Sequence, residues 1–95
     1  MATDISITST GDPSPQPLDT TPGSKIKWTN NTSSIISTFT LPTCVSPQTS
    51  PAPINPGAET RHYTVNNGTN GDYSYSYIVD DETDGVPKDG TIDVG

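Results

Sequence analysis

An alternating pattern near the C-terminal end of the sequence constrains the fold more than any other feature. From position 73 to position 79, every second residue is aromatic or β-branched, namely Tyr73, Tyr75, Tyr77 and Val79. Such side chains at a period of two are typical of a strand with one buried face. Residues 80–89 are too polar, and too interrupted by glycine and proline, to continue the sheet, whereas residues 91–94 resume the alternation. The pattern predicts a strand, an acidic loop and a closing strand.

Shorter alternating stretches predict the other strands. They cover residues 4–8, 18–20, 25–29, 35–41 and 59–65. In the stretch 35–41, Ile35, Phe39 and Leu41 are expected to share one face. No segment has the period of a helix. About seven short strands separated by turns predict an all-β Greek-key sandwich, with an immunoglobulin-like sandwich as the alternative fold.

Composition limits the core and the class of partner. Residues 1–95 are interpreted as one domain, and with 27% hydrophobic residues its core is small. Because ordering the chain costs about 1.5 kcal/mol per residue, modest stability is expected unless the domain assembles with partners. The net charge of −7 argues against binding to nucleic acid and to anionic membranes.

Targeting signals and disulfides are not evident. Residues 1–20 lack the apolar core of a signal peptide, and no apolar run reaches the length of a membrane span. Cys44 is the sole cysteine and has no internal disulfide partner. These observations predict a cytoplasmic protein, or a secreted or periplasmic one if a leader has been removed.

Four segments together resemble cupredoxins of the plastocyanin and azurin type. In chain order they are PGSKIKWTNN at residues 22–31, NPGAET at 55–60, GDYSY at 71–75 and GTIDV at 90–94. Their order and spacing agree with the family over about three-quarters of the chain. The resemblance implies a two-sheet Greek-key sandwich.

The same resemblance implies that all the copper ligands are lost. The family's first histidine, cysteine, second histidine and methionine fall on Ile35, Tyr77, Asp80 and Lys88. A blue-copper site needs one thiolate and two imidazoles, so the resemblance implies a chain without a cofactor. Ile35 and Tyr77 are expected to meet and fill the vacated site. The Tyr77 hydroxyl is expected to bond to Asp80 or to a loop carbonyl.

Metal binding at a site outside the family pattern is the alternative function. The loop 80–85 begins like a calcium loop, but Thr91 stands where an EF-hand has its glutamate. An exposed acidic loop is the favoured interpretation, and weak Ca²⁺ binding stays open. Cys44 and His62 are the other candidate ligands, although His62 is expected to be an ordinary solvent-facing residue and Cys44 a small, partly covered one.

The preferred function is a non-catalytic, metal-free binding or structural module. No nucleophile and base are paired in the sequence, so an enzyme is not expected. A protein partner or a second copy would bind through loops or an exposed sheet edge. The two expected interaction loops are residues 42–57 and 80–89, with the candidate residues Cys44, Pro51, Pro53, Asp81, Glu82 and Asp84.

Overall fold

The computed structural model describes residues 2–80 and 87–95, with side chains described from residue 4 onward. Asp81, Glu82 and Asp84, and with them most of the expected calcium-like loop, lie outside the described residues. The described chain is all-β and contains no helix. Its strands are β1 (Ala2–Ile7), β2 (Pro13–Ser14), β3 (Leu18–Thr20), β4 (Lys25–Asn30), β5 (Ile36–Thr40), β6 (Val45–Ser46), β7 (Tyr63–Val65), β8 (Gly71–Val79) and β9 (Lys88–Val94).

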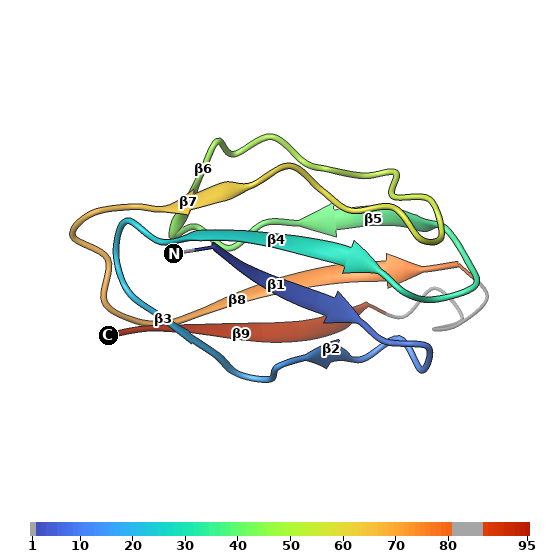
Figure 1. Ribbon diagram of the computed structural model, residues 1–95, viewed down its shortest axis with the longest axis horizontal. Coiled ribbons are helices and arrows are strands. Elements are labelled where there is room, and N and C mark those ends of the chain that lie inside the picture. Colours follow the sequence, from blue (N-terminus) through green and yellow to red (C-terminus); the bar gives the residue numbers. More distant parts are fainter. Residues whose placement is uncertain (1, 81–86) are drawn as a thin grey trace.

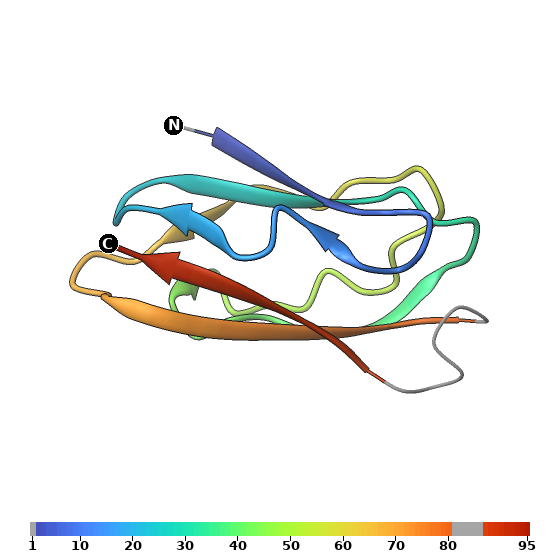
Figure 2. The ribbon, with the colours of Figure 1, turned by 90° about the horizontal axis from the view of Figure 1, so that it is seen from below.

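The strands form two sheets that lie one over the other (Figures 1 and 2). The first sheet has the order β2-β1-β4-β7-β6, and the second has the order β3-β9-β8-β5. Both sheets are mixed, because β1 runs parallel to β4 and β3 runs parallel to β9. The prediction of an all-β fold from alternating short strands is therefore confirmed.

Trp28 lies at the centre of the core between the sheets. It comes from β4 of the first sheet and meets the rings of Phe39 and Tyr75 from the second, with centroids 5.0 and 5.2 Å away and edge-on geometry. Tyr63 of β7 packs against the same indole at 5.7 Å. Aromatic pairs in such arrangements add about 0.5–1.5 kcal/mol each beyond their buried area. These rings thus connect the two sheets across the core.

The face predicted for β5 is partly wrong. The pairing of β5 with β8 shifts register between Ile36 and Thr38, which marks a bulge. A bulge inserts one extra residue and reverses the alternation on one side of it. Ile36 is consequently buried with Phe39, and Ile35 is only half-buried. A strict period of two could not anticipate this reversal.

The strand predicted at residues 59–65 is shorter in the structure. Only Tyr63–Val65 forms β7, and it pairs with β4 at Lys25 and Ile26. The residues before β7 also lie beside β4, but they are joined to it only by single hydrogen bonds. One example is the bond from the Thr60 N–H to the Trp28 carbonyl at 2.8 Å. The described part of the chain has no helix long and apolar enough to cross a membrane.

Candidate functional site

The four positions that the resemblance aligns with copper ligands, Ile35, Tyr77, Asp80 and Lys88, do not form one cluster. The Asp80 N–H donates to the Ile35 carbonyl at 2.9 Å, so these two residues lie opposite one another where β5 and β8 meet. The Ser37 hydroxyl donates to Asp80 Oδ1 at 2.7 Å. Tyr77 instead pairs with Phe39. The expected contact between Ile35 and Tyr77 is therefore wrong, because the bulge in β5 moves Ile35 out of the core.

Tyr77 is held from the other side of the sandwich. Its ring is 1% exposed and stacks on Phe39 with centroids 5.8 Å apart. Its hydroxyl donates to the Gly11 carbonyl, in the β1–β2 loop, at 2.7 Å. The partner is thus a loop carbonyl, which was one of the two expectations, and it is not Asp80. The contact joins strand β8 to a loop 66 residues earlier in the chain.

Lys88 is fixed beside Tyr77 by the same loop. The two residues are direct partners in the β8–β9 ladder. Lys88 Nζ pairs with Asp12 Oδ1 at 3.1 Å, one residue beyond Gly11. Tyr77 and Lys88 therefore contact the β1–β2 loop, whereas Ile35 and Asp80 contact each other and Asp80 also contacts Ser37.

Asn30, at the end of β4, organises the neighbouring loops and was not predicted as a site residue. It is a fully buried polar side chain. Its Nδ2 donates to the carbonyls of Ser34 and Ile54, both at 2.9 Å. Its Oδ1 accepts from the N–H and the hydroxyl of Thr32, at 3.0 and 2.6 Å. Because a buried amide must satisfy its hydrogen-bonding groups, Asn30 fixes the loops around it. The only signal in the sequence was that Asn30 lies in the segment 22–31.

The proline-rich loop 42–57 is packed against the sandwich. Ile36 and Ile54 exchange both backbone hydrogen bonds, each 2.9 Å long. The Ser50 hydroxyl donates to the Phe39 carbonyl at 3.0 Å, and the Tyr63 hydroxyl donates to the Thr49 carbonyl at 2.9 Å. The loop thereby covers the outer edge of β5, which would otherwise offer unpaired backbone groups. The segment thus contacts both sheets, since it also supplies β6 at the edge of the first sheet.

The candidate interaction residues of this loop differ in exposure. Pro53 is exposed and Pro51 is half-buried, whereas Cys44 is fully buried. Cys44 is therefore more enclosed than the partly covered side chain that was expected. Removing the loop would also remove Cys44, Val45 and Ile54 from the core. Exposed single positions such as Pro53 are consequently better probes of binding than a deletion.

Cys44 is expected to be inert towards alkylating reagents in the folded protein. Burial raises the pKa of its thiol, and the thiolate is the reactive form. Iodoacetamide labelling, followed by mass spectrometry, should be at least about 100-fold slower in buffer than in urea, because reaction requires opening of the fold. Labelling at the same rate under both conditions would contradict the burial.

The candidate metal ligands are not gathered in the described residues. His62 is exposed just before β7, as expected. Across residues 2–80 and 87–95, no three His, Cys, Asp or Glu side chains form a group suited to a metal ion. Among these described residues, Cys44 and His62 therefore belong to no group of three potential ligands.

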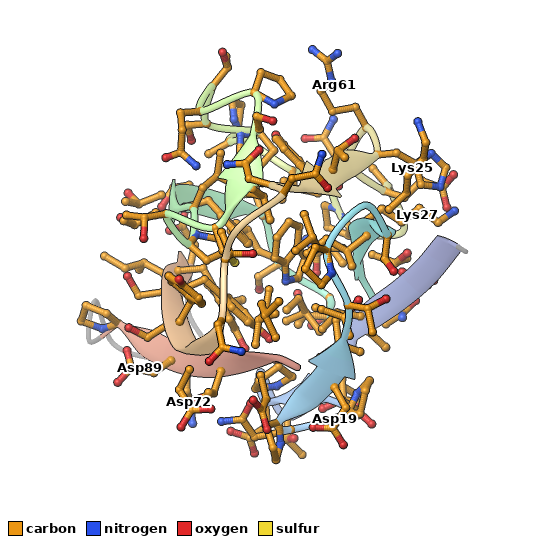
Figure 3. All side chains as sticks on the ribbon, turned by 90° about the vertical axis from the view of Figure 1, so that its left-hand side faces the viewer. Asp19, Lys25, Lys27, Arg61, Asp72 and Asp89 are labelled. Atoms are coloured by element: carbon orange, nitrogen blue, oxygen red, sulfur yellow. The ribbon has the colours of Figure 1, made fainter. Side chains whose placement is uncertain are left out.

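Three aspartates of the second sheet lie on the side of the molecule opposite three of its basic residues. Asp19, Asp93 and Asp72 are successive neighbours across β3, β9 and β8. Figure 3 shows Asp19, Asp72 and Asp89 on one side and Lys25, Lys27 and Arg61 on the other. Like charges directly opposite one another in a sheet are destabilising. The row of aspartates thus costs the second sheet some stability.

The buried tyrosines should make the protein sensitive to alkali. Burial raises the pKa of Tyr75 to about 12, and burial also raises the pKa of Tyr77, with smaller contributions from Tyr75, Asp12 and Asp89. In the unfolded chain both phenols would titrate near pH ~10. Below that pH their contribution to stability is constant. Above it, the unfolded chain releases protons that the folded chain retains, so the free energy of unfolding falls by about 1.4 kcal/mol per pH unit for each tyrosine.

Urea denaturation at about pH 8 and at about pH 11 measures this fall. Tyr75→Phe removes one of the two phenols, so the fall in the free energy of unfolding between these pH values should be smaller. General alkaline damage would lower the stability of both proteins equally, and the variant therefore serves as a control. An unfolding free energy that is the same at both pH values would contradict the effect of burial.

The sequence was compared with models of known protein families and with curated proteins. It matches no family model and no curated protein.

Proposed function

We propose that the chain is a metal-free, cupredoxin-like Greek-key sandwich that acts as a non-catalytic binding or structural module. The arrangement of the strands supports the Greek-key part of this proposal. From β4 the chain crosses to β5 in the second sheet, returns to β6 and β7 in the first, and crosses again to β8 and β9. Repeated crossing between two sheets is typical of Greek-key connections.

The placement of the resembling segments supports the cupredoxin-like part. The segment 22–31 supplies β4, the core residue Trp28 and the buried Asn30. The segment 55–60 lies against it, since the Gly57 N–H donates to the Asn30 carbonyl at 2.7 Å and the Asn30 N–H donates to the Ala58 carbonyl at 2.9 Å. Two segments that are 24 residues or more apart in the sequence thus meet at one end of the sandwich.

The main support for the proposal is the set of contacts made by the residues at the four ligand positions. Ile35 and Asp80 are hydrogen-bonded to each other, Tyr77 is bonded to Gly11, and Lys88 is paired with Asp12. None of these four side chains is a thiol, an imidazole or a thioether, which are the groups that a blue-copper site requires. They contribute to packing and to loop attachment. Binding would then depend on the surface loops and sheet edges.

Photo-crosslinking from exposed positions tests the proposed function. A photoreactive amino acid placed at Asp4, Pro53 or Asp72 samples the first sheet, the proline-rich loop and the second sheet. Irradiation of intact cells that contain the full chain should give a discrete covalent adduct from at least one position, identified by mass spectrometry. Asn67, in the exposed turn between β7 and β8, serves as the matched control position. Absence of any adduct above the Asn67 background would overturn the proposal.

A further inference from the structure

The outer edge of β1 is only partly covered. β2 pairs with Ser6 and Ile7 of β1, whereas β1 begins at Ala2. Figure 1 shows β2 alongside the C-terminal end of β1 alone. On that side, no strand of the described chain pairs with residues 2–5. The first sheet therefore ends in a short open edge.

Alternation along β1 identifies the backbone groups at this edge. The Ile7 carbonyl accepts from the Asn31 N–H on the β4 side, and the Thr8 N–H donates to the Asp12 carbonyl on the β2 side. Successive residues of a strand direct their backbone groups to opposite neighbours. The N–H and C=O groups of Ala2 and Asp4 consequently face outward, two donors and two acceptors in all.

The other edges are short or covered. The outer edge of β5 is bonded to Ile54 and Ser50. β2 and β6 have two residues each, and β3 has three residues and follows Pro17. Short strands and prolines are the usual protection of sheet edges. Among the described strands, β1 thus has the edge best suited to accept another strand.

We propose that this edge pairs with the same edge of a second copy, antiparallel and about a two-fold axis at Thr3. In this register Ala2 of each copy lies opposite Asp4 of the other, and the outward groups of both residues form four hydrogen bonds. The register centred on Asp4 would place two carboxylates side by side, which is destabilising. The pairing would join the two first sheets into one continuous sheet. It deepens the proposed function by naming the partner, and it rests on that function.

Charge complementarity favours a second copy. Lys25 is the β4 neighbour of Ala2, is exposed, and has no ion pair among the described residues. Lys27, by contrast, is paired with Glu59 at 2.7 Å. Asp4 of the second copy would lie two strands from Lys25, roughly 10 Å between backbones at the usual strand spacing. The Asp4 carboxylate accepts from the Thr29 hydroxyl of its own chain at 2.9 and 3.0 Å and would turn from it toward Lys25 of the other copy. A lysine and an aspartate side chain together can span most of that gap, so the dimer would contain two symmetric ion pairs.

Sedimentation equilibrium of the full chain over a range of concentrations tests the pairing. A monomer–dimer equilibrium is expected, weakened by salt because its ion pairs are exposed. Asp4→Pro removes one outward N–H from each copy and none of the backbone bonds between β1 and β4, although the Thr29 hydroxyl loses its bond to the Asp4 carboxylate. The variant should therefore abolish the dimer and leave the monomer folded. Circular dichroism of the variant checks that fold.

Charge reversal provides the second arm. Asp4→Lys and Lys25→Asp should each weaken the dimer by about tenfold, and the combined swap should restore it. Asp72→Lys, on the outer face of the second sheet, changes the net charge equally and should leave dimerisation unchanged. A chain that stays monomeric at every concentration, a dimer that Asp4→Pro does not weaken, or a swap that fails to restore it would overturn the pairing. The proposed function would survive these results if crosslinking from Pro53 or Asp72 still captured a partner.

Discussion

Gly90→Ala is expected to destabilise the protein by about 3 kcal/mol, an effect at the upper end of those usual for overpacking. Gly90 is buried in β9 directly opposite Tyr75 of β8. A Cβ at this position would overlap Cζ and the hydroxyl oxygen of Tyr75 and lie 2.6 Å from Cε1. The ring cannot move away easily, because it packs edge-on against Trp28 and parallel to Phe39. Urea denaturation of the variant measures the loss.

A double-mutant cycle with Tyr75→Ala tests the cause. Without the ring, Gly90→Ala should cost less than about 1 kcal/mol, as expected when a clash and not the backbone is responsible. Gly95→Ala is the matched control, since a Cβ there meets no atom within 4 Å. Equal costs for Gly90→Ala in both backgrounds would contradict the close packing of Tyr75 on Gly90.

Tyr77→Ala is expected to destabilise the protein by about 3–5 kcal/mol, the usual range for removing a large buried aromatic ring. The ring is 1% exposed and stacks on both Phe39 and Tyr75. The substitution also leaves the Gly11 carbonyl without its partner. Differential scanning calorimetry should show a large fall in the melting temperature.

Tyr77→Phe separates the hydroxyl from the ring. It keeps the stacking and removes only the hydrogen bond to Gly11, so it should cost about 1–2 kcal/mol. A Tyr77→Ala variant that melts with the parent would show that the ring does not contribute to the core.

Strict alternation made β8 of the second sheet predictable. β8 keeps one phase over nine residues, and Tyr75, Tyr77 and Val79 are buried as expected. The prediction failed where the period breaks. The bulge in β5 depends on the pairing of that strand with β8, and no local pattern in residues 35–41 encodes it. Ile36 therefore replaces Ile35 in the core.

The candidate site was less accessible to sequence reasoning, because its contacts join distant segments. The bond from Tyr77 to Gly11 and the ion pair from Lys88 to Asp12 each depend on how the β1–β2 loop lies against β8 and β9. The packing of the loop 42–57 depends in the same way on Ile36 and Phe39. The resemblance to cupredoxins implied that the ligand set was absent. They did not indicate which groups would take up the remaining hydrogen bonds.

The central proposal is that the four positions aligned with copper ligands, Ile35, Tyr77, Asp80 and Lys88, serve packing and loop attachment alone. Titration of the purified chain with copper(II), followed by visible absorption, tests it most directly. The account predicts no intense blue charge-transfer band, because the sole thiol, Cys44, is fully buried outside the four ligand positions. An intense blue band that disappears in Cys44→Ser would contradict it.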